Sequence, residues 1–381
     1  MKKNLWMLGM AVVALASCTQ SEVLDTPERP NIGFESFVGK QTRATADFEN
    51  VAGNMLVGAT GATNDLRDFW VFASHTEDGT STEYPFEGSA TDHVFWDAIN
   101  NTFTYNSLRQ WYLGSYQFFA YSDGNNKIGV GDENDPLKVD VNYANKTITF
   151  KDYVNNGNND LVASIPAPIV KNTSNISERV ALTFDHMLSC VELSFTNNSS
   201  NFYLDFQQIQ FNALSEGDCV YNTASTPAVS WTPNNSSSCI YDLKSNVYIP
   251  GDQEFGNPDV LLKPGVTATL HGFVIPQSNE DVQLTFYIVT YEKVATGEID
   301  PETGNPLYEY DYRSTDRYEA TLEIPATGSF VGHQEWKPGY VYRYTADVTG
   351  SMHYINFNVT AVTTWDQTLP PSSMSPAKNN N

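Results

Sequence analysis

The side chains that usually carry enzyme chemistry are scattered singly along this sequence. Six histidines occur, none at a catalytic or metal-ligand spacing from another: His75, His93, His186, His271, His333 and His353. The sequence contains no Gly-x-Ser-x-Gly, His-Glu-x-x-His, P-loop or Gly-x-Gly-x-x-Gly motif. A lone His on a strand is far more often a surface or satisfied core residue than a catalyst, so the sequence predicts that the chain is not an enzyme.

Carboxylates are numerous enough to keep one enzyme class open, the extracellular glycoside hydrolases, which need a pair of them. There are 45 acidic residues, and spacing alone singles out no pair. Asp132-Glu133-Asn134-Asp135 could bind Ca²⁺ through oxygen ligands. Asp123-Gly124-Asn125-Asn126-Lys127 begins like an EF-hand loop, but Ile128 stands where that loop needs glycine. Solvated turns are the favoured interpretation of both, and no metal or cofactor is predicted.

Aromatic side chains offer a second kind of chemistry, stacking on sugar rings. Trp111, Tyr112, Trp336 and Tyr340 are candidates for such a platform. The cores of β-sandwiches use the same residue types, so the signal is weak.

The spacing of the cysteines argues against a metal site. Four are present, Cys18, Cys190, Cys219 and Cys239, and no Cys-x-x-Cys or Cys/His spacing suggests zinc. Cys219 and Cys239 flank a turn-rich stretch, so a disulfide closing a hairpin is one prediction for them. Cys190 lies in a strand-like run and is expected to be a small buried apolar residue.

The first eighteen residues read as an export signal. Lys2 and Lys3 precede an uncharged stretch, Leu5–Leu15, which as a helix would span only about 16 Å and is too short to cross a bilayer. The small residues before Cys18 resemble a bacterial lipobox, in which the cysteine is acylated and becomes the new N-terminus. The sequence therefore predicts a lipoprotein of the bacterial envelope, anchored through Cys18.

The chain is strongly acidic, with a formal net charge of −24 at pH 7. Removal of Lys2 and Lys3 with the signal would take this to −26. Such a chain has no basic surface for nucleic acid and is repelled by anionic headgroups, so neither is expected as a partner.

An all-β fold is predicted from the alternation of apolar and polar residues with period two. Two runs, Asp68–Ala73 and Tyr116–Tyr121, are strongly apolar, as expected of strands covered on both faces, and Lys146–Phe150 is interpreted as a third strand of this kind. Half-buried strands are expected in several further segments: 180–195, 282–288, 318–324, 340–348 and 355–361. This pattern favours antiparallel sandwiches.

A length of 381 residues suggests two domains. The polar segment Lys171–Asn175 is the expected boundary between them. The predicted division is a signal peptide at 1–18, a leader with a first strand at 19–43, sandwich domains at 44–175 and 176–366, and a disordered tail at 367–381.

Several different short motifs are spread along nearly the whole chain. They are Cys18, Ile32-Gly33-Phe34, Thr42-Arg43-Ala44, Phe69–Ala73, Trp111 to Ser122, Asp160–Ala163, Val180–Leu188, Lys337–Tyr342 and the closing strand up to Trp365. Together they resemble the fimbrillin family, the subunits of type V pili in Bacteroides-like bacteria. The resemblance implies two tandem transthyretin-like antiparallel β-sandwich domains.

The resemblance also implies a maturation step at Arg43-Ala44. A trypsin-like protease would cut after Arg43 and release the lipid together with the first strand. A strand from another subunit would then fill the empty groove, giving a homo- or heteropolymer. The segment after Trp365 is rich in proline and unlike a donated strand, so tip and anchor roles stay open beside the stalk role.

Two other functions remain as alternatives to a fimbrial subunit or pilus-associated adhesin. One is a glycan-binding surface lipoprotein that keeps its anchor, and the other is a glycan hydrolase. The receptor is not specified by the sequence.

Overall fold

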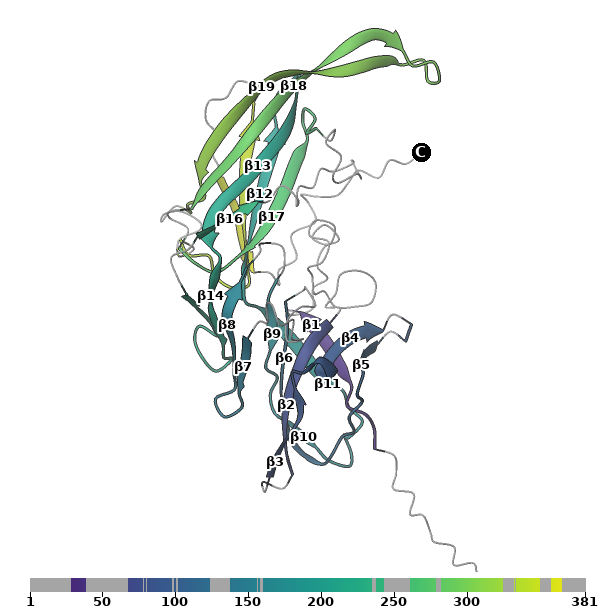
Figure 1. Cartoon of the computed structure of the whole chain (residues 1–381), viewed down its shortest axis with the longest axis vertical. Helices are drawn as coiled ribbons and strands as arrows, with labels where there is room; N and C mark the ends of the chain where they lie inside the picture. The colour runs from purple at the N-terminus through teal and green to yellow at the C-terminus, as the bar shows by residue number, and fades with distance from the viewer. Residues whose placement is uncertain are drawn as a thin grey trace, which may run out of the picture.

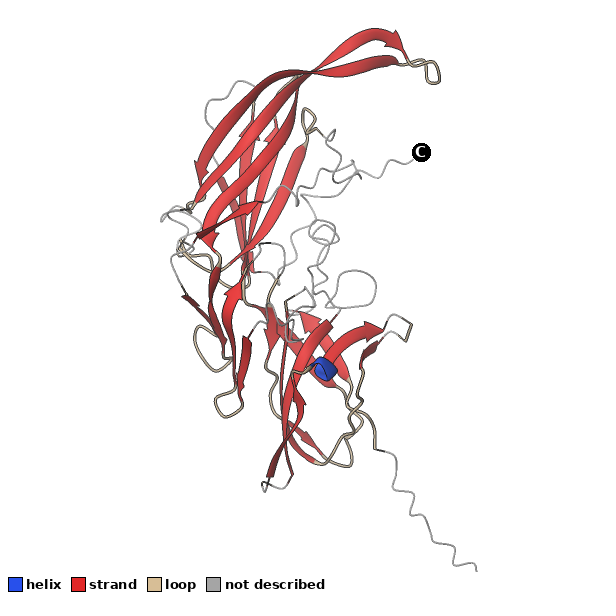
Figure 2. Ribbon diagram, in the orientation of Figure 1, coloured by secondary structure: helices blue, strands red, loops and turns tan. Residues whose placement is uncertain are grey.

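The computed structural model describes residues 29–38, 68–77, 79, 81–97, 99–100, 102–123, 138–155, 157, 160–234, 238–242, 261–278, 282–324, 332, 334–349 and 358–364. Within these ranges the chain is built almost entirely of strands, with a single short 3-10 helix, η1, at Ala90–Asp92. The prediction of an all-β fold is confirmed (Figure 2). The tandem transthyretin-like arrangement stays a prediction.

The strands make four sheets that assemble into two sandwiches, one at each end of an elongated molecule (Figure 1). The larger sheet of the N-terminal sandwich runs in the order β1-β11-β9-β6-β2-β4-β5, with β10 beside β6 and β3 beside β2. Its strands are β1 Phe34–Val38, β2 Asp68–Glu77, β3 Ser81–Glu87, β4 His93–Asp97, β5 Thr102–Tyr105, β6 Gly114–Ser122, β9 Val162–Ser164, β10 Ile169–Lys171 and β11 Val180–His186.

The second sheet of the N-terminal sandwich has the order β15-β14-β8-β7. Its strands are β7 Lys138–Asn142, β8 Thr147–Val154, β14 Glu216–Tyr221 and β15 Val229–Pro233. Trp70 and Tyr121 from the larger sheet pack in one buried cluster with Phe150 and Tyr221 from this sheet. The two sheets therefore face each other across an aromatic core.

The C-terminal sandwich packs the sheet β17-β12-β20-β21 against the sheet β16-β13-β18-β19. Its strands are β12 Ser189–Asn197, β13 Phe202–Leu214, β16 Ser238–Asp242, β17 Thr267–Val274, β18 Gln283–Ile299, β19 Pro306–Thr321, β20 Tyr340–Val348 and β21 Asn358–Thr364. The alternation seen in the sequence appears as burial: Leu284, Phe286 and Ile288 face the core, while Thr285 and Tyr287 do not. β18 and β19 continue beyond the sandwich as a projecting hairpin (Figure 1).

Strands β2 and β6 are covered on both faces, as their apolar runs predict. Phe69 and Val71 of β2 point into a third buried cluster, while Trp70 between them points into the core shared with the second sheet. Phe118 and Phe119 of β6 divide in the same way. The third cluster lies inside the curl of the larger sheet, which brings β1 close to β5.

The expected domain boundary at residue 175 is wrong as a division between sheets. β11, which begins at Val180, pairs with β1 and β9 and so belongs to the N-terminal sandwich. Further along, β14 pairs with β8, although Glu216 and Val154 lie on opposite sides of the expected boundary. The chain thus returns from the C-terminal sandwich, and the hairpin β14–β15 completes the second sheet of the N-terminal sandwich. Local composition does not indicate strand pairing over such a distance in sequence.

Candidate functional site: the groove of the first strand

β1 is an edge strand of the larger N-terminal sheet, and it lies within the segment expected to be a removable leader. It pairs in parallel with β11, in a register that runs from Phe34 opposite Val180 to Val38 opposite Phe184. It forms one end of the strand order, so its only ladder partner among the described strands is β11. Removing β1 would expose one side of β11 and disturb no other described ladder.

The backbone just before β1 is held from two sides. The amide of Ile32 donates to the carbonyl of Arg109 at 2.7 Å, and the amide of Trp111 donates to the carbonyl of Pro30 at 2.9 Å. On the opposite side, the amide of Val180 donates to the carbonyl of Gly33 at 2.8 Å. Residues 30–33 therefore occupy a groove between β11 and the segment after β5.

An aromatic pocket holds the side chain of Phe34. Four rings surround it with centroid distances of 5.8 Å (Phe69), 5.7 Å (Phe86), 5.8 Å (Tyr105) and 6.0 Å (Phe118). All four contacts are edge-on, the geometry that aromatic quadrupoles favour. Phe34 is only 1% exposed and belongs to the cluster inside the curled sheet. The leader strand is thus part of the core.

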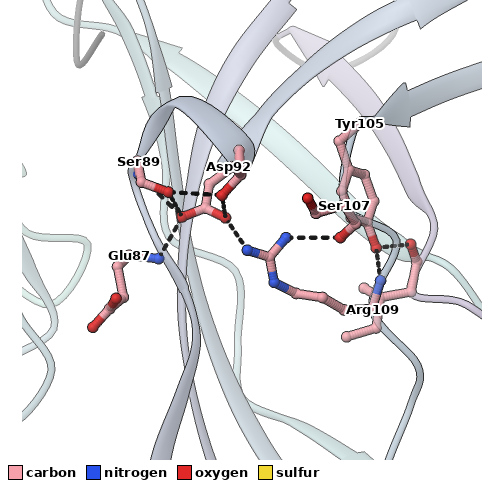
Figure 3. A network of polar contacts seen from close by, with 8 residues as sticks. Glu87, Ser89, Asp92, Tyr105, Ser107 and Arg109 are labelled. Carbon is pink, nitrogen blue, oxygen red and sulfur yellow. Dashed lines mark hydrogen bonds and ion pairs between the residues drawn. The ribbon is translucent and has the colours of Figure 1, made fainter. Parts of the chain in front are cut away.

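A polar network centred on the buried carboxylate of Asp92 supports the outer wall of this groove (Figure 3). The carboxylate of Asp92 accepts from the amides of Glu87 at 2.9 Å and Ser89 at 3.0 Å, and it pairs with the guanidinium of Arg109. The same guanidinium lies 4.4 Å from the ring centroid of Phe86, one wall of the Phe34 pocket. Arg109 in turn supplies the carbonyl that accepts from Ile32. The network therefore fixes the segment that grips the leader.

Tyr105 connects this network to the leader directly. Its hydroxyl donates to the carbonyl of Ile32 at 2.9 Å and accepts from the amide of Arg109 at 3.2 Å. Burial raises the pKa of Tyr105 above its ordinary value of 10.0, against a smaller opposing effect of its hydrogen bond from Arg109. The neutral, donating hydroxyl is therefore the favoured form in the folded protein.

Tyr105→Phe is expected to weaken the hold on the leader by about 1 kcal/mol at neutral pH, because the Ile32 carbonyl loses its donor. A raised folded-state pKa gives stability that is complete below pH 10 and is lost as the pH rises through that pKa. The difference in unfolding free energy between wild-type and variant should therefore shrink at alkaline pH. Urea titrations at pH 7 and above pH 10 would measure it, and a difference that grows with pH would contradict this role.

The structure reaches only part of the predicted site. Cys18, Arg43 and Ala44 lie outside the described residues, as do the tail at 367–381 and the candidate calcium-binding turn at 132–135.

The disulfide predicted between Cys219 and Cys239 is not formed in this structure. Cys219 is a buried free thiol whose strand neighbours are Phe150 and Trp231. Position 239 lies on β16 opposite Ala213, in a sheet of the other sandwich, and the side chain of Cys239 lies outside the described residues. The turn after Cys219 closes the hairpin β14–β15, but position 239 lies beyond that hairpin, on β16. Cys190 is buried, as expected for a small apolar residue.

The predicted sugar platform is wrong for its two tryptophans. Trp111 and Trp336 are completely buried, and the indole of Trp336 donates to the hydroxyl of Tyr344 at 3.0 Å. Tyr112 is exposed, but Tyr340 is only partly so, and it packs against the core of the other sandwich. These four residues form no common surface.

The histidines with described side chains sit in packed surroundings. His186 Nδ1 is 2.5 Å from the carboxylate of Asp160, and both residues are buried. Burial raises the pKa of Asp160, and the neighbouring His186 opposes that shift. His75 stacks on Tyr116 and contacts the carbonyl of Leu113 at 2.9 Å.

Sequence reasoning missed Asp92, Tyr105 and Arg109, which support the groove. The available signal was an arginine two residues before Trp111 in an aromatic stretch, because an arginine there needs an acidic partner if it is buried.

A model of the fimbrillin-like family matches residues 42–365. The chain belongs to the fimbrillin-like family. No curated protein sequence matches it significantly. Among solved structures it is similar to a fimbrial protein from Bacteroides vulgatus, with 17% identity, a TM-score of 0.45, and coverage of 88% of this chain and 99% of that one.

Two other solved structures show similar coverage. A candidate cell adhesion protein from Bacteroides uniformis has 13% identity and a TM-score of 0.43, over 89% of this chain and 99% of that one. Candidate polysaccharide-binding proteins from Bacteroides thetaiotaomicron give 9% identity and a TM-score of 0.33, over 88% of this chain and 98% of that one.

The family assignment points to a fimbrial or adhesive, non-enzymatic role at the cell surface. It also suggests assembly with other pilus subunits. Among the described residues, no helix has the length and apolar character needed to cross a membrane.

Proposed function

We propose that this fimbrillin-like protein is a pilus subunit or pilus-associated adhesin that is activated by removal of its leader. Export as a lipoprotein through Cys18 would place the precursor at the outer membrane. Cleavage after Arg43 would then free both the anchor and β1. The groove left by β1 would take a strand from another subunit, which joins the two.

The single observation that supports this proposal is the position of β1 as a core-filling strand at a sheet edge. Ile32 and Phe34 are 2% and 1% exposed, yet the strand has only one ladder neighbour among the described strands. Arg43 follows β1 by five residues, well before β2 begins at Asp68. A cut there separates the leader strand from the rest of the chain.

The free energy lost when β1 leaves favours the binding of another strand in the empty groove. Burial of one large apolar side chain is worth about 1.5–3 kcal/mol, so loss of Ile32 and Phe34 together forfeits several kcal/mol. The carbonyl of Arg109 and the amide of Val180 also lose their leader partners. Unpaired strand edges are ready templates for another strand, so the cut subunit should be unstable alone and stabilised in a polymer.

Arg43→Gln is expected to abolish assembly triggered by an arginine-specific protease. Wild-type protein should lose the fragment ending at Arg43 and form multimers in size-exclusion chromatography with light scattering, whereas the variant should stay intact and monomeric. Arg67→Gln is the matched control, since it removes the next arginine along the chain and should leave assembly unchanged. Arg29 precedes Pro30, a bond such proteases cleave poorly because proline restricts the backbone.

Two results would contradict the proposal. One is multimer formation by Arg43→Gln at the wild-type rate. The other is wild-type protein that is cut after Arg43 and remains a stable monomer.

A further inference from the structure

The groove that holds β1 imposes side-chain requirements at three consecutive positions. These requirements can be read from the resident strand, because each of the three residues meets a different part of the wall. The inference rests on the proposed function, since it concerns the strand that replaces β1.

The third position demands an aromatic side chain. The ring of Phe34 meets four others edge-on at 5.7–6.0 Å, and the pocket is closed to solvent around it. A smaller side chain would leave a void lined by aromatic carbon, and such voids are costly because the surrounding rings relax only partly.

The second position favours a small side chain. A Cβ on Gly33 would lie 3.2 Å from Cγ of Arg179 and 3.5 Å from its Cδ and Nε. The carbonyl of Gly33 accepts from the amide of Val180, so the backbone is held close to β11. A methyl group could be accommodated by a small movement of Arg179, but a β-branched side chain would force Arg179 or the backbone away.

The first position demands an apolar side chain, together with a backbone amide and carbonyl that can both hydrogen-bond. Ile32 is 2% exposed within the same cluster as Phe34. Its amide donates to Arg109 and its carbonyl accepts from Tyr105. The next residue beyond the triplet, Glu35, is exposed, so its side chain meets no requirement of the groove.

We propose that the groove selects its incoming strand by the triplet apolar–small–aromatic, placed in the direction of β1. The partner is thus a second subunit that carries an extended segment of this pattern. Subunits whose donated segment lacks the aromatic residue, or carries a branched residue before it, would be excluded from this junction.

Competition by synthetic peptides would test the triplet. The full-length protein is cut after Arg43 with excess peptide of residues 30–38, Pro-Asn-Ile-Gly-Phe-Glu-Ser-Phe-Val, and the fraction of multimer is measured against peptide concentration. The native peptide should cap the groove and suppress multimers. The Phe34→Ala peptide should need a concentration about 100-fold higher or more. The Gly33→Val peptide should need at least about 10-fold more, and the Glu35→Gln peptide should match the native one.

The outcomes separate this inference from the proposed function. If the native peptide and all variants suppress multimers equally well, the groove recognises only the peptide backbone. The proposed side-chain requirement is then wrong, while strand exchange remains supported. A peptide of the same composition in reversed order that competes equally would also overturn the stated direction. If even the native peptide has no effect on multimers formed after the cut, strand replacement in this groove is wrong, and the triplet with it.

Discussion

Replacing Phe34 by alanine is expected to lower the free energy of unfolding by about 3–5 kcal/mol. The side chain fills a closed pocket between Phe69, Phe86, Tyr105 and Phe118, and its removal leaves a cavity that these rings cannot close. Urea unfolding followed by tryptophan fluorescence would measure the change in the free energy of unfolding.

Glu35→Ala provides the matched control on the same strand. Glu35 is exposed, so its replacement should change the free energy of unfolding by no more than about 0.5 kcal/mol. Equal stabilities for Phe34→Ala and Glu35→Ala would show that the leader strand is not part of the core in solution.

Asp92→Ala is expected to lower the free energy of unfolding by about 2–3 kcal/mol, because the partly buried guanidinium of Arg109 loses the carboxylate it pairs with. Asp92 also accepts from the amides of Glu87 and Ser89, which lose their acceptor. The groove wall should loosen with it, since Arg109 grips the backbone at Ile32. The variant should therefore lose its leader strand to arginine-specific cleavage faster than wild-type protein.

Asp140→Ala serves as the comparison for an exposed ion pair. Asp140 lies 3.5 Å from the ammonium of Lys151 with both side chains largely exposed, and such pairs contribute about 0–1 kcal/mol. Thermal unfolding and the rate of leader cleavage of both variants would decide the matter. A cost for Asp92→Ala as small as that for Asp140→Ala would contradict the supporting role of the network.

Local pattern was sufficient to predict much of the fold. The continuous apolar runs at Phe69–Ala73 and Phe118–Tyr121 predicted strands covered on both faces, and the two faces do meet different cores. A first strand was also expected within the leader, and β1 lies there at Phe34–Val38. Alternation with period two is a local property of the sequence, so it predicts a strand and its buried face without knowledge of the partner strands.

Long-range pairing was beyond such reasoning. Nothing near Glu216 indicates that β14 should pair with β8, and the boundary at residue 175 failed for this reason. The pairing of Asp92 with Arg109, and the burial of Trp111 and Trp336, likewise depend on chain segments that meet only after folding. Aromatic residues predicted as a ligand platform proved to be core, because both roles draw on the same side chains.

The most direct test of the account is hydrogen exchange of β11, residues 180–186, before and after cleavage at Arg43. In the intact protein β1 covers this strand, and the amide of Val180 bonds to Gly33. We expect slow exchange in the precursor, faster exchange in the cut monomer, and protection restored in the multimer. Exchange of β11 that does not change when the protein is cut would show that the groove stays closed and would contradict activation by loss of the leader strand.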